Sequence, residues 1–464
     1  MGGLVLTLFS RSCYYPAPHR RSLAIVKSPM TRPRTPTRRF FLYMNPRENH
    51  LIDSVESLRT EMIRFTRDLV AQPSTLGNEA GALEVMAAEL DTLGFASRRV
   101  PIDPNTLSQH PGFSPVPWDY EGRYNVVALR PADQEGGKSA LFNGHLDVVS
   151  PEPTDRWERN PFEPYEKDGW LYGRGAGDMK AGIAAMTYAV KAVEEAGFGL
   201  KAPVFIEAVI EEECSGNGAL ACLKAGIDAD AVLIPEPFGP TILTAQVGVA
   251  WFKVTLGGIP VHVLDARGGV NAIEKCFPLF NALRTLEQDL NHQVHPAFAA
   301  VPHPANLNIG IIKGGDWPST VPAFAEFHCR IGFTPVVAFS EVQEKIRQAI
   351  AGAAAADTWL SKHPPRVDFY GFRSEGHCVS RDLPAFRTLG GCHWDLSGSD
   401  PDIFISTATT DLRTFVHFGR GQATCFGPVA KNIHAENERV WIDSVFHTAK
   451  VYALFLARWC GLTD

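Results

Sequence analysis

The sequence lacks the features that mark several common classes of protein. No run approaches the roughly 20 apolar residues that a membrane-spanning helix needs, so no membrane partner is expected. The net charge of −7 has the wrong sign for a protein whose main partner is nucleic acid or an anionic membrane. The nine cysteines are odd in number and form no CxxC pair, which indicates reduced thiols and a cytoplasmic location. No internal repeat stands out.

Acidic residues are absent from the start of the chain. Nine arginine and lysine residues occur up to Arg47, whereas the first acidic residue is Glu48, and prolines interrupt any helical pattern. We therefore expect residues 1–47 to be a disordered leader outside the folded domains. Two interpretations stay open. In the first, the start of translation is mis-assigned and lies at Met44, just before the first convincing helix. In the second, residues 1–43 are a transit peptide, which would place the protein in an organelle matrix.

The length and the apolar pattern predict two domains. A chain of 464 residues is too long for one ordinary core. Apolar residues recur at helical spacing from Leu51 to Leu93, and Gly94 ends that pattern. Short apolar runs then alternate with helical segments: strands at 125–129, 139–143, 204–210 and 231–234, and helices at 181–196 and 218–225. This order predicts an α/β domain over 48–247 with a doubly wound, mostly parallel sheet.

The pattern changes near Gly248. A strand at 250–256, a long amphipathic helix within 269–290, strands at 306–313 and 323–333, and a helix at 340–356 follow in turn. This β-α-β-β-α order is half of a ferredoxin-like sandwich and predicts an inserted α+β domain over 248–363. The chain would then return to the first domain over 364–464, with strands at 367–370 and 423–426 and a closing helix at 442–459.

Residues capable of binding metal lie where apolar runs end. His145 and Asp147 close one run, and a lone Asp178 follows about thirty residues later in a glycine-rich turn. Three glutamates, 211–213, follow the next strand, and Glu236 follows another. Open α/β sheets build their sites at the carboxyl ends of strands, and carboxylate and imidazole groups suit zinc or a similar ion. One His-x-Asp pair alone would fit a structural histidine equally well, but several such clusters in order favour a metallohydrolase.

These motifs resemble those of the metallopeptidase and deacylase family of acetylornithine deacetylase, succinyl-diaminopimelate desuccinylase, aminoacylase and glutamate carboxypeptidase. The resemblance covers about residues 50–464. It implies two divalent ions, most simply zinc, with cobalt or manganese as alternatives. The ligands that it implies are His145 and Glu236 at the first metal, Asp178 bridging both, and Glu213 and His434 at the second.

The resemblance also implies roles for two further carboxylates. Asp147 would hold the other ring nitrogen of His145 and so fix its tautomer. Glu212 would be the general base, which takes a proton from the attacking water and passes it to the leaving amine. The register among the three glutamates is open. Placing Gly218 at the glycine of the family motif makes Glu212 the base and Glu213 the ligand, which we prefer. A shift by one would make them Glu211 and Glu212. Whichever glutamate has neither role would be a solvated carboxylate at the rim.

Two candidates for substrate contacts lie in the inserted domain, which resembles a lid. The segment 257–262 is similar to one in which relatives carry a histidine that reaches into the partner's site and stabilises the oxyanion, so His262 and a homodimer through the lid are implied. Without the resemblance, His262 reads as a core or surface residue. Thr320 stands in the lid turn where relatives often have an asparagine, and its hydroxyl could still donate a hydrogen bond.

Three charged residues are candidates for binding a substrate carboxylate or for shaping the loop around it. Arg330, on the strand after the lid turn, could grip a carboxylate bidentately, or it could form an ordinary salt bridge on its strand. Asp411 and Arg413 follow an apolar strand and could form a mutual ion pair that orients the loop. Arg413 is also a second candidate for the carboxylate.

The function implied by the resemblance is a two-metal amidohydrolase that acts on an N-acyl amino acid or a related small amide. The lid turn at 314–322 is most similar to the acetylornithine deacetylase branch, so deacylation is preferred. A dipeptidase or carboxypeptidase of the same family is the alternative. A catalytically inactive binding protein would be expected to lack a ligand or the base, and none is missing. A structural zinc site would be rich in thiolates, and no proposed ligand is a cysteine.

Overall fold

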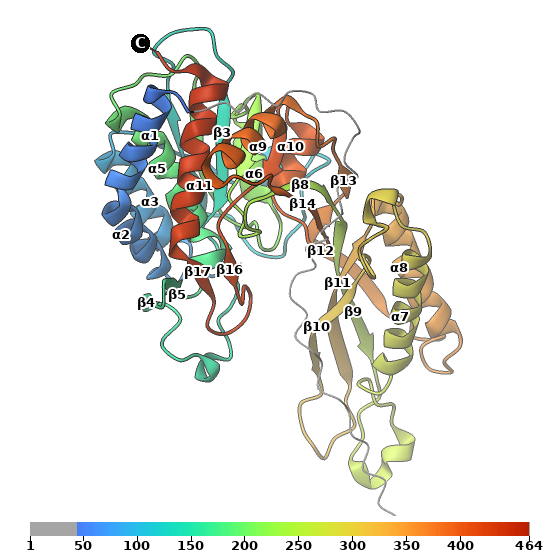
Figure 1. Ribbon diagram of the computed structural model, residues 1–464. Helices are drawn as coiled ribbons and strands as arrows, with labels where there is room; N and C mark the ends of the chain where they lie inside the picture. Colours follow the sequence, from blue (N-terminus) through green and yellow to red (C-terminus); the bar gives the residue numbers. More distant parts are fainter. Residues whose placement is uncertain (1–43, 464) are drawn as a thin grey trace, which may run out of the picture.

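The computed structural model describes residues 44–463 and has a larger and a smaller domain (Figure 1). The larger domain is built on a six-stranded sheet. Its strand order is β1 (Ser97–Pro101), β2 (Tyr124–Arg130), β6 (Val204–Val209), β3 (Ala140–His145), β7 (Ala231–Ile234) and β15 (Gln422–Cys425). β6, β3, β7 and β15 are parallel neighbours, whereas β2 is antiparallel to both β1 and β6. The predicted α/β class with a mostly parallel sheet is confirmed.

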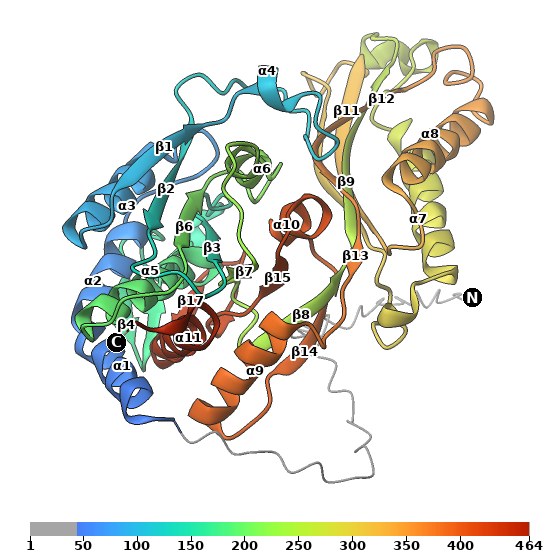
Figure 2. The same ribbon diagram turned by 90° about the horizontal axis from the view of Figure 1, so that it is seen from above.

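Helices cover both faces of this sheet, as Figure 2 shows. One layer contains α1 (Pro46–Ser57), α2 (Arg59–Val70), α3 (Ala80–Thr92), α5 (Ala181–Glu195) and α11 (Ile442–Leu456). The other contains α6 (Asn217–Lys224) and α10 (Leu412–Phe418). α5 is rich in alanine and almost wholly buried between the sheet and α11. Its first turn needs Gly182, because a Cβ there would lie 2.4 Å from the carbonyl oxygen of Pro235.

The smaller domain has an antiparallel sheet with two helices on one face. The strand order is β10 (Leu307–Gly314), β11 (Phe324–Phe333), β9 (Gly248–Gly257) and β12 (Arg366–Ser374), and the helices are α7 (Cys276–His292) and α8 (Phe339–Ala355). Alternate residues of β9, such as Phe252 and Val254, are buried in a core shared with both helices. This period-two burial is what an inserted domain with one covered sheet face requires.

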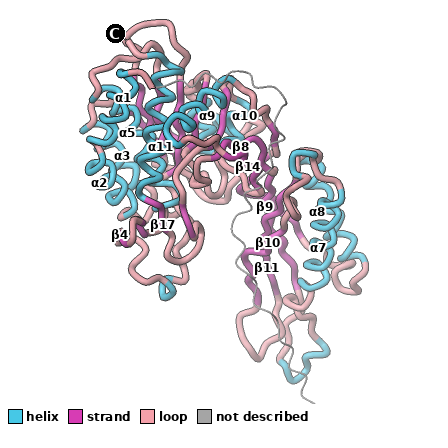
Figure 3. Tube along the Cα trace, in the orientation of Figure 1, coloured by secondary structure: helices cyan, strands magenta, loops and turns pink. Residues whose placement is uncertain are grey.

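Two details differ from the sequence prediction. The strand at 367–370 was assigned to the first domain, but β12 pairs with β9 in the smaller sheet, so that assignment is wrong. The helix predicted within 269–290 begins only at Cys276. A 3-10 helix (Val263–Gly268) and then a turn precede it at the end of the smaller domain (Figure 3). The domain division itself stays a prediction, and β12 favours a second boundary after Ser374.

Two small sheets and two further helices complete the described chain. A three-stranded sheet contains β13 (His377–Cys378), β8 (Thr241–Gln246) and β14 (Asp402–Ser406). A second small sheet contains β16 (Ala430–Lys431), β17 (Arg439–Trp441), β5 (Trp170–Tyr172) and β4 (Tyr165–Lys167). The remaining helices are α4 (Pro104–Leu107) and α9 (Pro384–Ser397). The segment between β16 and β17 carries His434.

The predicted leader lies mostly outside the described residues. α1 begins at Pro46, inside the stretch 1–47 that the sequence assigned to the leader. Asn45 caps it: the Asn45 side chain accepts a hydrogen bond from the Glu48 N–H, and the Glu48 carboxylate accepts one from the Asn45 N–H. The first helix therefore does follow Met44 directly. Within residues 44–463, no helix has the length and apolar character needed to span a bilayer.

Candidate metal centre

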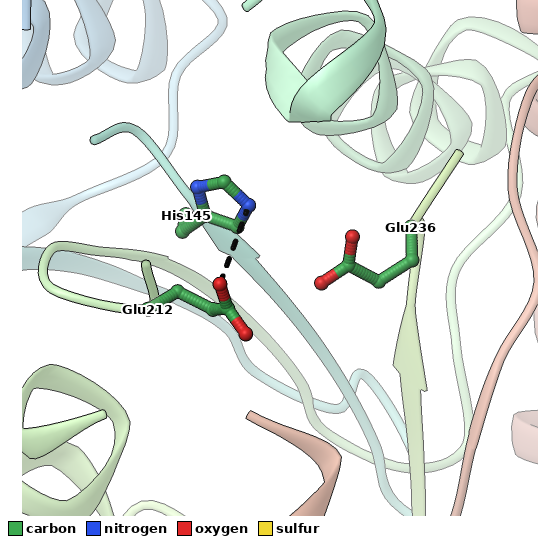
Figure 4. A group of neighbouring side chains, drawn as sticks. All are labelled: His145, Glu212 and Glu236. Atoms are coloured by element: carbon green, nitrogen blue, oxygen red, sulfur yellow. Dashed lines mark ion pairs between the residues drawn. The ribbon is translucent and has the colours of Figure 1, made fainter. Parts of the chain in front are cut away.

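The carboxyl ends of three neighbouring parallel strands bring acidic and imidazole side chains together. His145 ends β3, Glu212 follows β6 and Glu236 follows β7, and Figure 4 shows these three side chains converging. One nitrogen or oxygen atom from each lies within 4.8 Å of the others, and the same holds for His145, Asp178 and Glu213. The residues predicted at these strand ends are thus brought together by the fold.

Asp178 lies between two histidines and faces each with a different oxygen. Its Oδ1 is 3.1 Å from Nε2 of His145, and its Oδ2 is 3.5 Å from Nε2 of His434. The same His434 nitrogen lies 2.9 Å from Oε1 of Glu213. A carboxylate with an imidazole on either side is the arrangement that a bridging ligand needs. The set of hard oxygen and imidazole donors fits two divalent ions such as zinc.

Asp147 orients both His145 and the loop after β6. Nδ1 of His145 lies 2.9 Å from the backbone oxygen of Asp147 and 3.7 Å from its Oδ1, so the closer partner is the carbonyl. The carboxylate accepts hydrogen bonds from the N–H groups of Glu212 and Glu213 at 3.3 and 3.1 Å. Burial raises the pKa of Asp147 to about 7. These contacts leave Nε2 of His145 facing the cluster.

The three consecutive glutamates have different surroundings. Glu211 is fully buried and is paired with Arg123. Three neutral donors complete its surroundings: Trp118 Nε1 at 2.6 Å, and the hydroxyls of Tyr120 and Ser215 at 2.5 Å each. The expectation of a solvated carboxylate at the rim is therefore wrong for this residue.

Glu212 contrasts with Glu211 in having few partners. Its Oε2 is 4.0 Å from Nε2 of His145, and its buried Oε1 has no hydrogen-bond partner among residues 44–463. Burial, reinforced by the nearby charges of Glu236 and Asp411, raises the pKa of Glu212 well above its usual value. Since Glu211 is fully engaged elsewhere, the geometry favours Glu212 as base and Glu213 as ligand over the shifted register.

One buried carboxylate near the cluster was missed by the sequence reasoning. Glu438 accepts hydrogen bonds from the N–H groups of Gly175, Gly177 and Asp178 and pairs with Arg174 at 2.5 Å. It lies four positions after His434, where its sequence neighbourhood looks like that of any surface acid. Only the tertiary structure shows that it holds the turn that carries Asp178.

Asp411 and Arg413 are buried beside the loop that follows Glu213. Oδ1 of Asp411 lies 3.9 Å from Nη2 of Arg413, so the predicted ion pair is present. Nη1 of Arg413 donates to the carbonyl oxygen of Thr410 at 2.8 Å. Gly216 adopts φ +72°, and a Cβ there would lie 1.8 Å from Nη2 of Arg413, so only glycine fits. Burial raises the pKa of Asp411 to about 6.

Arg330 is held by neutral groups. Its Nη2 donates to the carbonyl oxygen of Thr407 at 2.9 Å, and its Nη1 donates to the side-chain oxygen of Asn306. Within residues 44–463 no carboxylate pairs with it, so the alternative of a salt bridge on its strand is not supported. Burial lowers its pKa to about 10.

His262 and Thr320 are adjacent to each other but are not brought to the metal ligands of the same chain. They form an isolated antiparallel β-bridge. His262 is exposed, and its Nδ1 accepts a hydrogen bond from the N–H of Leu264 at 3.1 Å. The adjoining segment 263–268 lies at the end of the smaller domain remote from β3 (Figure 1). A role for His262 at a metal centre therefore requires a second chain.

Known proteins share this sequence pattern and fold. The model of the peptidase family M20/M25/M40 matches residues 141–458. The chain is 29% identical over 432 residues to the N-formyl-4-amino-5-aminomethyl-2-methylpyrimidine deformylase of Bacillus subtilis (strain 168), covering 88% of this chain and 96% of that protein. It is 31% identical over 313 residues to the acetylornithine deacetylase of Edwardsiella ictaluri, covering 65% and 76%.

Solved structures agree with the fold. A di-peptidase from Saccharomyces cerevisiae aligns with 89% of this chain and 98% of its own, with a TM-score of 0.72 and 15% identity. A dinuclear metal-binding peptidase of the M20 family from Bacillus subtilis aligns over 87% and 99%, with a TM-score of 0.57 and 14% identity.

Proposed function

This chain belongs to the peptidase family M20/M25/M40 and is a hydrolase of amide or peptide bonds, and we propose that it is a two-metal deacylase of small N-acyl amines. The observation that carries the proposal is the position of Asp178 between His145 and His434, one histidine to each carboxylate oxygen. Two ions would be held by His145, Asp178 and Glu236, and by Asp178, Glu213 and His434. We propose zinc as the native metal.

Two such ions would supply Lewis acidity for an amide carbonyl and lower the pKa of water. The chain's own contribution to proton transfer is assigned to Glu212. Its Oε1 is buried and accepts no hydrogen bond from the described part of the chain, so it is available to take a proton from a water molecule and deliver it to the leaving amine. Asp147 supports this role by fixing the N–H groups of Glu212 and Glu213.

Deacylation is preferred to peptide hydrolysis because of what the relatives are. The two sequence relatives are named as a deformylase and a deacetylase, so both remove a short acyl group. The likeness to the di-peptidase is at 15% identity and concerns the fold alone. A dipeptidase or carboxypeptidase of this family remains the alternative. An inactive binding protein is disfavoured, because every proposed ligand and the base are present in the described structure.

Two residues of the smaller domain are proposed to act on the substrate. We propose that Arg330, a half-buried guanidinium whose hydrogen-bond partners within residues 44–463 are neutral, binds a substrate carboxylate. Arg413 is less available, because Asp411 and Thr410 already engage it. We further propose that His262 acts in the partner's site of a homodimer formed through the smaller domain, and that the protein is cytoplasmic.

The test is hydrolysis by protein that has been stripped of metal and then reloaded with zinc. The panel contains N-formyl and N-acetyl amino acids, N-acetylornithine, N-formyl-4-amino-5-aminomethyl-2-methylpyrimidine and unmodified dipeptides. Zinc-dependent release of amine from the acylated compounds, with slower cleavage of the dipeptides, is the expected result. Preferential cleavage of dipeptides would replace the deacylase by the peptidase. No turnover of any compound, despite two bound ions per chain, would refute both.

A further inference from the structure

Glu438 joins the two segments that carry Asp178 and His434. The segment between β16 and β17 contains His434 and ends at Glu438. The other segment is the glycine-rich turn between β5 and α5, which carries Asp178. The side chain of Glu438 is fully buried and lies against that turn. One carboxylate thus links two of the three parts of the chain that supply the proposed second metal site, those that carry Asp178 and His434.

Both oxygens of Glu438 are occupied by donors from the turn. Oε1 accepts the N–H groups of Gly177 and Asp178, each at 2.9 Å. Oε2 accepts the N–H of Gly175 at 3.1 Å and pairs with Nη1 of Arg174 at 2.5 Å. Four N–H donors on one carboxylate form a saturated, charge-assisted set. Glu438 is therefore not available as a metal ligand itself, although it is an acid close to the centre.

The turn needs an external acceptor because its backbone is not helical. Asp178 has φ −113° and ψ 93°, so its N–H has no place in a helical hydrogen-bond ladder. The turn is also pressed against β16: a Cβ at Gly177 would lie 2.6 Å from Cβ of Ala430. Arg174 adds a second link, since its Nη2 is 3.4 Å from the carbonyl oxygen of Ala435, the neighbour of His434.

We propose that Glu438 is a positioning residue for the metal centre, which holds Asp178 at the distance from His434 that lets both ions bind. The inference rests on the proposed two-metal function. Glu438 would then affect the affinity for metal, which a carboxylate that is merely buried would not do. A residue with a merely structural role would change the stability of the fold and leave the affinity for metal unchanged.

The test compares Glu438→Gln with Glu436→Gln, an exposed glutamate two positions earlier in the same segment. The glutamine in Glu438→Gln has one amide nitrogen, which is a hydrogen-bond donor. It must face either Arg174 and Gly175 or the N–H groups of Gly177 and Asp178, so in either orientation it faces other donors and those hydrogen bonds are lost. Zinc affinity is measured by competition with a chromophoric chelator, and the fold by circular dichroism and thermal unfolding of the metal-free proteins.

We expect Glu438→Gln to bind zinc about 10–100-fold more weakly than wild type, the usual cost of losing a group that orients a ligand. Its kcat should fall at saturating zinc with little change in KM, while Glu436→Gln matches wild type. Zinc affinity in Glu438→Gln equal to that of wild type would overturn the inference.

Arg174→Lys provides a second comparison, because it removes the guanidinium and leaves the three backbone donors of Glu438. It should weaken zinc binding less than Glu438→Gln does. If Glu438→Gln does not fold, wild-type affinity in Arg174→Lys would overturn the inference. If the wild-type protein itself binds no zinc, the two-metal function is refuted. If the wild-type protein binds zinc and the variant binds it equally well, only the inference about Glu438 is refuted.

Discussion

Replacing the buried Glu207 by glutamine should remove a pH-dependent cost in stability. Glu207 lies in the centre of β6 with no exposed surface, and its Oε2 accepts a hydrogen bond from Nδ2 of Asn143 at 3.0 Å. Its Oε1 has no hydrogen-bond partner within residues 44–463. Burial raises the pKa of this carboxyl from 4.5 to about 8. The folded protein therefore keeps a proton on Glu207 at neutral pH.

The sign and size of the effect follow from that shift. Between pH 4.5 and about 8 the unfolded chain has released the proton that the folded chain still holds, so the stability of the wild type falls as the pH rises. Each pKa unit corresponds to about 1.4 kcal/mol, which gives roughly 3 kcal/mol at about pH 7 and roughly 5 kcal/mol at about pH 8. Glu207→Gln has no proton to lose, so it should gain on the wild type by these amounts.

Thermal unfolding at a series of pH values measures this gain. For a catalytic domain of roughly 300 residues, about 1 kcal/mol corresponds to roughly 1.5 °C in Tm, so the Tm advantage of Glu207→Gln should grow by about 7 °C between about pH 4.5 and about pH 8. Both proteins are measured with the same metal content. Glu121→Gln changes an exposed glutamate and is the control, since its Tm should differ from that of the wild type by the same amount at every pH. A Tm difference for Glu207→Gln that does not change with pH would refute the reasoning.

Four further outcomes are expected. Glu212→Gln should abolish turnover and leave the metal content intact. Glu211→Gln should chiefly lower thermal stability, because Glu211 pairs with Arg123. Activity that is retained in Glu212→Gln and lost in Glu211→Gln would restore the shifted register. His262→Ala should lower kcat about a hundredfold, as the loss of one oxyanion donor does, and a near-native rate would make it a surface residue. Gly216→Ala should cost about 1–3 kcal/mol in a urea unfolding curve, since its Cβ would overlap Arg413, and an unchanged midpoint would contradict that. Chelation of metal should lower Tm by an amount that zinc restores and magnesium does not, which a melting curve with each ion checks.

The parts that the sequence predicted well depend on local pattern. Strands 204–210 and 231–234 and the helix at 181–196 agree closely with β6, β7 and α5, because apolar runs and an alanine-rich stretch encode them directly. The gathering of His145, Glu212 and Glu236 followed from the rule that the ends of parallel strands meet at one edge. Their chemical roles stay predictions, since proximity does not identify a metal.

The parts that the sequence did not predict depend on contacts between distant residues. Nothing near Glu211 indicates that Trp118, Tyr120 and Arg123, about ninety positions earlier, enclose it. The assignment of 367–370 to the wrong domain has the same origin. A strand of that composition pairs equally well with either sheet until the register with β9 is known.

The charges in the centre argue for two ions rather than one. Four carboxylates meet there, those of Asp178, Glu212, Glu213 and Glu236, and within residues 44–463 none of them is paired with a lysine or arginine. Uncompensated carboxylates in a buried site are costly, as the raised pKa of Glu236, due to burial and then to Asp178, shows. One divalent ion would leave about two negative charges in place, whereas two ions balance all four. Two nearby arginines instead pair with other carboxylates: Arg123 with Glu211, and Arg174 with Glu438. The acids that shape the loops are thus neutralised by the protein, whereas those that face the centre remain for the two ions that we propose.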